Sequence, residues 1–237
     1  GIRKSNKNNL EFIKRSGVNY FLQEKPRNWF ENTSKDLPEI KVNTNKNKEA
    51  KIQELVNNIK SHETPLKNSA KNLVVYDGNL EAKVMLIGEA PGKEEDIQGI
   101  PFVGRAGQLL NKMIAAINLK REDVYITNAV YWRPPDNRTP SDEEILEFLP
   151  FLQQQIDIVS PDFIFLLGSV AAKAILSTPL ALGKLRGSWH EYQSLQLNKK
   201  IPTIASYHPA FLLRSPQYKK ASWEDLQMLQ KKLYEKN

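Results

Sequence analysis

The stretch that most constrains the fold of this chain is residues 83 to 110, where a short apolar run stops abruptly. Val84, Leu86 and Ile87 are typical of a strand buried in a sheet. The turn GEAPG follows at once, and a helical pattern with one apolar face begins near residue 104. This order of strand, turn and helix predicts an α/β sheet, in which ligands bind just beyond the strand ends.

Further apolar segments repeat the pattern along the chain. We expect core strands at 83–88, 123–130, 162–168 and 201–207, with an extended segment at 72–78 and a hairpin strand near 189–195. Helices are predicted at 50–61, 104–118, 142–158, shortly after 168, and at 220–235, the last burying Trp223, Leu226, Leu229 and Leu233. The fold class is therefore α/β, a three-layer α/β/α sandwich with a central, mainly parallel four-stranded sheet.

The domain organisation follows from composition. Residues 1–49 read as a basic N-terminal extension with a short helical segment and a linker, and residues 50–237 as the main folded domain. Residues 1 to 50 hold eleven Lys or Arg against six Asp or Glu, so they carry +5 of the net charge of +7. A basic tail attracts nucleic acid, but a solvated charge run is the commoner explanation, and charge alone does not indicate DNA binding.

Composition also excludes several kinds of chemistry. The chain has no cysteine, which rules out disulfides, thiolate catalysis and any cluster or zinc site built on cysteine, and it has three histidines. Its apolar runs are shorter than the roughly 18 residues of a membrane span, and no signal-peptide segment is present. We expect a monomeric cytoplasmic protein with no membrane association.

Polar residues at three strand ends predict a site. If the strands are parallel, their carboxyl ends bring Glu89, Asn128 and His208 to one crevice. The Asn128 amide could read the N3–H and O4 edge of a pyrimidine, or could simply bond to a neighbouring loop backbone. His208, aimed by the stiff turn at Pro209, could donate to a developing oxyanion, although a lone histidine is more often structural.

Other candidates surround this crevice. Phe102 lies in the loop GIPFVG and could stack on a planar base or plug the core beneath it. Glu89 could position a water or only accept hydrogen bonds within its turn. Four residues are candidate phosphate contacts: Arg105, Gln108, Arg186 and Arg214.

Five segments in order resemble the family 4 uracil-DNA glycosylases of the uracil-DNA glycosylase superfamily. They are LIGEAPGKEEDIQGIPFVGRAGQLL, VYITNAVYWRPPDNRTP, LLGSVAAKAIL, KLRGSW and SYHPAFLLR, within residues 72 to 235. The resemblance implies a monofunctional enzyme of base excision repair that flips uracil out of single- or double-stranded DNA and hydrolyses its N-glycosidic bond, leaving an abasic site.

The resemblance also implies residue roles. Phe102 would stack on uracil, Asn128 would read its N3–H and O4 edge, and His208 would stabilise the uracil anion through O2. Glu89 and the adjacent backbone of Gly88 and Ala90 would line the pocket and place the attacking water. The DNA contacts would include Arg186 and Gly187, with Arg214 on a phosphate and either Leu212 or Leu213 filling the gap left by the flipped nucleotide.

One departure from the family is substantial. Its members typically carry an iron–sulfur cluster on four cysteines, and the corresponding positions hold Ser61, Thr64, Trp132 and Phe148. None of these is a cluster ligand. We therefore expect no metal and no cofactor, with packed side chains filling the volume of the cluster. The acidic segment after GEAPG is left without chemistry, Glu95 and Asp96 being expected to brace the loop through backbone amides.

Two readings remain open beside uracil excision with turnover. The segment RPPDNRTP lacks the histidine-bearing insertion through which a related branch traps uracil-DNA covalently, so turnover is expected. A DNA-binding scaffold of the same fold without turnover is one alternative. A glycosylase for another deaminated base, such as hypoxanthine or xanthine, is the other, because the small residue Gly92 leaves the pocket wall less obstructed.

Overall fold

A computed structural model describes residues 44–194 and 196–235, and the predicted helical segment of the extension lies outside them. The first described helix, α2 (Thr44–Ser61), begins six residues before the predicted start at residue 50. No helix of the described part is long and apolar enough to cross a membrane.

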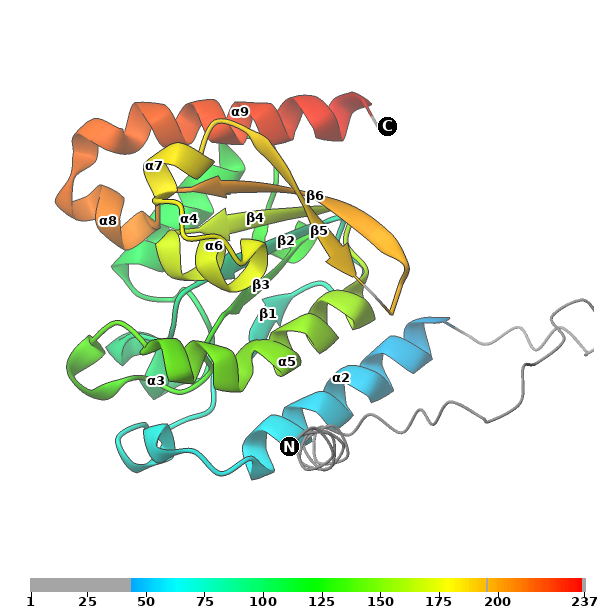
Figure 1. Cartoon of the computed structure of the whole chain (residues 1–237), viewed down its shortest axis with the longest axis vertical. Coiled ribbons are helices and arrows are strands. Elements are labelled where there is room, and N and C mark those ends of the chain that lie inside the picture. The colour runs from blue at the N-terminus through cyan, green and yellow to red at the C-terminus, as the bar shows by residue number, and fades with distance from the viewer. Residues whose placement is uncertain (1–43, 195, 236–237) are drawn as a thin grey trace, which may run out of the picture. The chain divides into compact units, whose positions relative to one another are not determined.

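The sheet has six strands in the order β1-β3-β2-β4-β6-β5 (Figure 1). Four of them are parallel neighbours: β3 (Val124–Asn128), β2 (Val84–Gly88), β4 (Phe163–Leu167) and β6 (Lys199–Ser206). Two antiparallel strands, β1 (Tyr76–Gly78) and β5 (Trp189–Ser194), close the edges. The predicted parallel core of four strands is confirmed, and the extended segment and the hairpin strand are its edge strands.

Helices cover both faces of this sheet, which confirms the three-layer sandwich (Figure 1). On one face α2, α5 (Asp142–Val159) and α6 (Ser169–Leu176) pack against side chains such as Met85 and Ile164. On the other face α4 (Arg105–Ala115) and α9 (Lys219–Glu235) pack against Leu86 and Phe165. Successive strand residues point to opposite faces, so fully apolar strands supply both cores.

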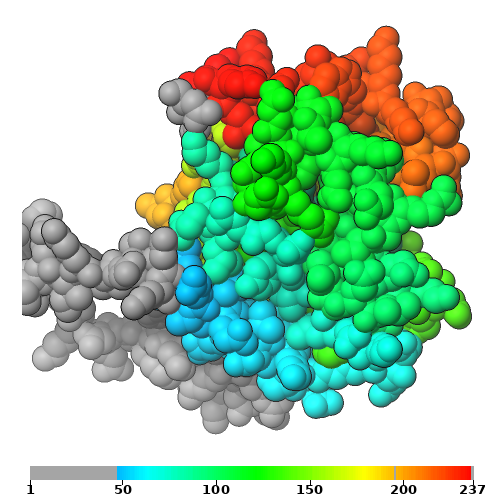
Figure 2. Space-filling view, turned by 180° about the vertical axis from the view of Figure 1, so that it is seen from behind, coloured from blue at the N-terminus to red at the C-terminus, as the bar shows by residue number. Residues whose placement is uncertain are grey.

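Short helices complete the domain. They are α3 (Lys93–Gln98), α7 (Leu182–Leu185) and α8 (Pro209–Arg214), with 3₁₀ turns η1 (Pro65–Asn68), η2 (Arg121–Asp123), η3 (Pro135–Asn137) and η4 (Pro216–Tyr218). From behind, the green surface of α4 adjoins the orange and red surface of α8 and α9 (Figure 2). The acidic segment after GEAPG was expected to be a loop, but the structure shows that part of it forms the helix α3.

The prediction for the face of the last helix is wrong at one position. Leu226 and Leu229 are buried, but Trp223 is 38% exposed. Ser222 and Asp225 occupy the interior positions beside it. Because Asp225 has hydrogen-bonding partners in the interior, the helix is turned so that a carboxylate faces inward and an indole faces outward.

Candidate active site

A cavity of about 380 Å³ opens at the carboxyl ends of the parallel strands. Its wall includes Glu89 after β2, Asn128 at the end of β3 and His208 after β6. The register pairs Gly88 with Asn128, so the ends of β2 and β3 lie level. The structure therefore brings together the three residues that the strand ends predicted, together with Ala90, Phe102 and Arg214.

Asn128 presents an unused hydrogen-bond acceptor. Its side chain is 2% exposed, and its Oδ1 accepts no hydrogen bond from any described residue. Gly88 makes this arrangement possible, because a Cβ there would lie 2.5 Å from Asn128 Oδ1 and 2.4 Å from the Phe102 ring. A buried amide oxygen without a partner costs free energy, and this oxygen can accept a hydrogen bond from a donor that enters the cavity.

Phe102 is held in an unusual backbone conformation beside this amide. Its φ is +54°, in the left-handed region that side-chain-bearing residues seldom adopt. The ring is 5% exposed, packs in the core with α4 and also lines the cavity, so it fills the core as the second alternative predicted, and its stacking on a base stays a prediction. It stacks on the His208 ring at 5.6 Å and 25°.

Arg121 fixes the loop that carries Phe102. Its guanidinium donates to the carbonyl oxygens of Phe102, at 2.9 Å, and Pro101, to Asn111 Oδ1 at 3.1 Å and to Asp77 Oδ2 at 2.5 Å. A planar fork that binds two consecutive carbonyls restricts the peptide between them. The α4 helix approaches the same carbonyl so closely that a Cβ on Gly107 would lie 1.9 Å from Phe102 O.

Replacing Arg121 with alanine should loosen the Phe102 ring. If this ring stacks on a bound base in both ground and transition states, we expect KM to rise about 10-fold with kcat nearly unchanged. The matched control is Lys48→Ala, which also removes a cation bound to two carbonyls and a carboxylate, but at α2 and outside this cavity. Equal kinetics for both variants would contradict this role for Arg121.

His208 is neutral and its tautomer is set by the backbone. Its Nδ1 accepts a hydrogen bond from the N–H of Ala210 at 3.0 Å, because Pro209 begins helix α8 and His208 caps it. Burial, assisted by the positive charge of Arg214, lowers the pKa of His208 to about 4. With Nδ1 occupied as an acceptor, the single proton is on Nε2, which makes the ring a donor.

Glu89 is a carboxyl group that holds its proton more tightly than usual. Burial raises the pKa of Glu89, while Arg214 and a hydrogen bond from Thr139 act in the opposite direction. Its backbone carbonyl accepts from Val130 N at 3.1 Å, which ties the turn to the chain beyond β3. A carboxylate with a raised pKa beside a cavity is suited to accept a proton from water.

The predicted DNA contacts divide into two groups around α4 and α8. Arg105, Gln108 and Arg214 are exposed, and Arg214 also lines the cavity. Leu212 is 1% exposed and packs in the interior, whereas Leu213 is half-buried on the same helix. Of the two leucines between which the sequence could not choose, only Leu213 has a surface that another molecule can reach.

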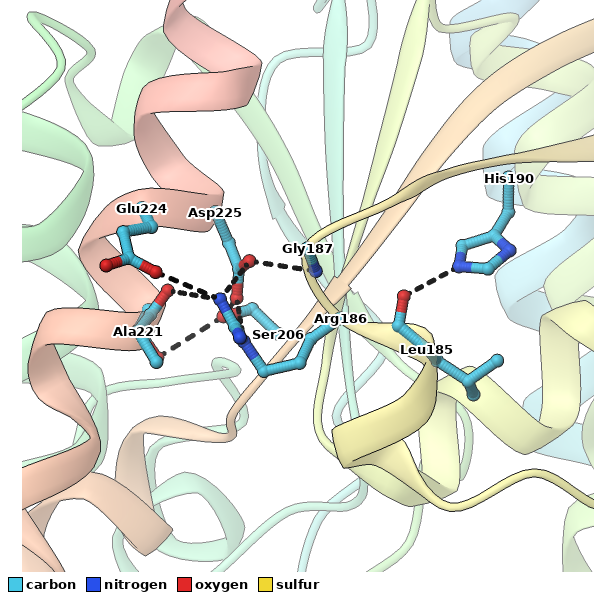
Figure 3. A network of polar contacts seen from close by, with 9 residues as sticks. Leu185, Arg186, Gly187, His190, Ser206, Ala221, Glu224 and Asp225 are labelled. Carbon is cyan, nitrogen blue, oxygen red and sulfur yellow. Dashed lines mark hydrogen bonds and ion pairs between the residues drawn. The ribbon is translucent and has the colours of Figure 1, made fainter.

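Arg186 has an internal partner instead of a free charge (Figure 3). Its guanidinium donates to both carboxylate oxygens of Asp225 at 2.8 and 3.1 Å, and to Ala221 O at 2.9 Å. Asp225 also accepts from Ser206 Oγ at 2.7 Å and from Gly187 N at 3.1 Å. One carboxylate thus joins α9, the end of β6 and the exposed Gly187 turn, and the expectation that Arg186 contacts a phosphate is not supported by this placement.

Removing the carboxylate of Asp225 should destabilise the domain. Asp225→Ala leaves Arg186, Ser206 and Gly187 without their acceptor, and we expect the free energy of unfolding in urea to fall by about 3 kcal/mol. Asp142→Ala removes an exposed ion pair with Lys173 and should cost no more than about 1 kcal/mol. Similar losses in the two variants would mean that the hydrogen bonds of Asp225 stabilise the domain no more than an exposed ion pair does.

The positions at which the family resemblance would place cluster ligands are filled by ordinary side chains. Ser61 is exposed, whereas Thr64, Trp132 and Phe148 are buried. The Phe148 ring is 0% exposed and packs edge-on against Tyr131. None of the four is a thiolate, and the described residues contain no group of histidine, cysteine and carboxylate side chains that could hold a metal. This corner does not fit an iron–sulfur cluster.

The acidic segment braces the loops around the cavity, as expected. Glu95 Oε1 accepts from Val103 N at 3.0 Å and Gly104 N at 2.9 Å. Asp96 Oδ1 accepts from Lys71 N at 2.7 Å and Asn72 N at 2.9 Å. Both carboxylates therefore accept hydrogen bonds from backbone N–H groups of neighbouring loops.

Several cavity residues were not singled out from the sequence. Asn137, Arg138 and Thr139 line the cavity from the loop after Pro134. Two left-handed residues, Asp136 and Asn137, turn this loop back towards the cavity. The Pro- and Asn-rich composition of RPPDNRTP indicated a turn but not its direction. Arg121 and Asp225 carried no signal, because a charged residue in a short turn or on a helix is ordinarily solvated.

Comparison with known proteins agrees with this geometry. Residues 75–227 match the family model described as "Uracil DNA glycosylase superfamily". A type-4 uracil-DNA glycosylase from Pyrobaculum aerophilum is 41% identical over 182 residues, 75% of this chain and 91% of that protein. One from Thermotoga maritima is 43% identical over 152 residues, 64% and 77% of the two chains. A type-5 enzyme of Pyrobaculum aerophilum is 31% identical over 148 residues, 56% and 63%. The chain belongs to the uracil-DNA glycosylase superfamily.

Proposed function

We propose that this protein is a DNA repair glycosylase that removes uracil from DNA by hydrolysing its N-glycosidic bond. The single observation that carries the proposal is the buried, unpartnered Oδ1 of Asn128 in the cavity wall. Uracil offers N3–H as a donor to this oxygen and O4 as an acceptor for the amide nitrogen. Cytosine offers the reverse pattern, an acceptor at N3 and a donor at N4, and is refused.

The base enters the cavity flipped out of the DNA. The Phe102 ring stacks on it, while Asn128 reads its edge. Unstacking and unpairing the nucleotide cost a few kcal/mol, less for a base in a U·G mismatch or a single strand. Half-buried Leu213 fills the gap left by the flipped nucleotide, and Arg214 contacts a phosphate beside it. Arg105 and Gln108, exposed in the first turn of α4, are placed for further backbone contacts.

Bond cleavage leaves negative charge on uracil and positive charge on the sugar. The Nε2–H of neutral His208 donates to uracil O2 and stabilises the anion as the N1–C1′ bond breaks. Glu89 stabilises the sugar cation and orients a water molecule, whose oxygen bonds to C1′ while its proton passes to the Glu89 carboxylate; a proton then returns through solvent to N1 of the departing uracil anion. The products are free uracil and an abasic site. No step uses a metal or a cofactor.

Hydrolysis is the chemistry that this cavity favours over a lyase reaction. A lyase of this kind needs an amine to form a Schiff base with the sugar, and the described lining of the cavity includes arginines but no lysine. The proposed enzyme is therefore monofunctional. It acts as a monomer on uracil-containing DNA, since every group in the mechanism comes from one chain.

The proposal is tested with labelled oligonucleotides that carry one uracil in single-stranded, U·G and U·A form. After incubation with the protein, alkali cleaves the strand at abasic sites, and we expect cleavage in at least the single-stranded and U·G substrates. Binding without cleavage in any form would favour a scaffold without turnover. Cleavage of hypoxanthine or xanthine substrates, but not of uracil, would assign a different base.

A further inference from the structure

Three aromatic rings form a cluster next to the cavity, contributed by Tyr207, Phe211 and Tyr218. The ring centroids lie 5.2 Å apart for Tyr207 and Phe211, 5.0 Å for Tyr207 and Tyr218, and 5.1 Å for Phe211 and Tyr218. Tyr218 is 39% exposed, and the other two rings are half-buried. This aromatic cluster is therefore anchored on one side and open on the other.

The geometry of α8 places the aromatic cluster at the mouth of the cavity. Ala210 and Arg214, one turn apart, line the cavity. Residues on a helix are separated by about 100°, so Phe211 lies on one flank of the cavity-facing line and Leu213 lies on the other. Leu212 faces the interior, as its burial requires. A DNA strand that crosses the mouth of the cavity past Leu213 would next reach the aromatic cluster.

The surroundings of the aromatic cluster suit a polyanion. Arg214, Lys219 and Lys220, which lie within three residues of Phe211 or Tyr218 in the sequence, are exposed, and residues 209–223 contain no Asp or Glu. The Arg186 guanidinium, 6.0 Å from the centroid of the Tyr207 ring, is paired with Asp225 and lies 3.6 Å from Glu224, so its charge is offset within the protein and the cations that could follow a DNA backbone are the three exposed ones. Aromatic rings bordered by cations are the combination that binds single-stranded nucleic acid, the rings stacking on bases and the cations following the backbone.

We infer that the aromatic cluster is a stacking platform for an unpaired base of the damaged strand, adjacent to the flipped uracil. A base within a duplex already stacks on both neighbours, so only single-stranded or locally opened DNA can use the platform. The platform thus gives the enzyme a preference for uracil in single strands. This inference rests on the proposed function, because the platform is defined as the site next to the nucleotide that the proposed enzyme flips into the cavity.

Binding of a fluorescent single-stranded 15-mer with one central uracil, followed by anisotropy at short times, tests the platform directly. One base stacked on an aromatic side chain contributes about 1–3 kcal/mol, so Tyr218→Ala should weaken binding about 10-fold. Tyr218→Phe keeps the ring and should bind like the wild type. Tyr234→Ala removes a 62% exposed tyrosine near the other end of α9 and should have no effect.

The neighbouring base is removed in the second arm of the experiment. Oligonucleotides in which a tetrahydrofuran residue replaces one base, on either side of the uracil, should bind the wild type about 10-fold more weakly for one of the two sides. The same replacement should not weaken binding further in Tyr218→Ala. This variant has already lost the ring, so removing the base that would stack on it takes away no further contact. Affinity for the U·G duplex should be the same in both proteins.

Charge is tested separately from stacking. The double variant Lys219→Gln, Lys220→Gln should reduce the slope of log K against log salt for the single strand by about 1.4, since each phosphate contact on a single strand contributes about 0.7. An unchanged slope would show that Lys219 and Lys220 do not contact phosphates of the bound single strand.

The outcomes separate this inference from the proposed function. If the wild type binds these oligonucleotides in the pattern described but releases no uracil, the platform stands and the proposed activity fails. If the wild type excises uracil but Tyr218→Ala binds single strands as tightly as the wild type, the activity stands and the platform is refuted.

Discussion

Replacing Asn128 with aspartate should lower kcat/KM on uracil-containing DNA by about 1,000-fold. The buried Oδ1 and the amide nitrogen together match N3–H and O4 of uracil, and a carboxylate offers only acceptors. It would face O4 of uracil with a second negative oxygen, so the base would lose a hydrogen bond and gain a repulsion. Sites built to hydrogen-bond a group discriminate by several orders of magnitude against the mismatched partner. Single-turnover excision from the U·G oligonucleotide measures the effect.

The control for this change is Asn58→Asp, the same substitution on the exposed face of α2. It should leave kcat/KM within about twofold of the wild type. Circular dichroism verifies that both variants are folded before the kinetics are compared. Wild-type kinetics in Asn128→Asp would show that this amide does not read the base, and the proposed function would lose the observation on which it depends.

Replacing His208 with alanine should lower kcat about 100- to 1,000-fold, the cost of removing one preorganised donor to a developing anion. KM should change much less, because the charge on uracil O2 develops only in the transition state. Protonation of His208 should not contribute to any loss of kcat as the pH falls from 7 to 5, whereas protonation of Glu89, whose pKa is raised by burial, should lower kcat as the pH falls. The pKa of His208 is lowered to about 4, so the ring remains the same neutral donor over that range.

Stability should respond to His208 in a defined pH window. In the unfolded chain this histidine binds a proton near pH 6.5, whereas in the folded protein it does so only near pH 4. Between these values the unfolded state binds more protons, so the free energy of unfolding falls as the pH falls through the window, by roughly 2–3 kcal/mol. Urea unfolding at pH 7, 5.5 and 4 measures the loss, and His208→Ala should show a correspondingly smaller one. Identical pH dependence in the two proteins would refute the lowered pKa.

The sequence predicted those parts of the site that follow from strand ends. Glu89, Asn128 and His208 are separated by up to 119 residues, yet a parallel sheet leaves one place for the carboxyl ends of its strands. The roles of Glu95 and Asp96 as loop braces were predictable for a similar reason, since carboxylates near glycine-rich turns commonly accept backbone amides. Local chemistry and strand order were sufficient in these cases.

The parts that were wrong or missing depend on tertiary partners. Apolar spacing put Trp223 inside, but the pairing of Asp225 with Arg186 turned the helix and left the indole at the surface. The choice between Leu212 and Leu213 required the rotation of α8, which packs against α4. Arg121 is linked to Phe102 and Asp77 across 19 and 44 residues, and no spacing rule reveals such a contact.

The close approach of the Phe102 ring and the Asn128 amide to Gly88 also bears on what happens after the bond is cleaved. The loop that carries the ring is held by Arg121, and no described residue bonds to the amide oxygen, so no hydrogen bond within the protein has to break when a base arrives. A rigid receptor of this kind makes the same contacts with a free base as with one attached to DNA. Liberated uracil should therefore leave slowly and compete with the next lesion, which would make product release, and not hydrolysis, the step that sets the pace of repair.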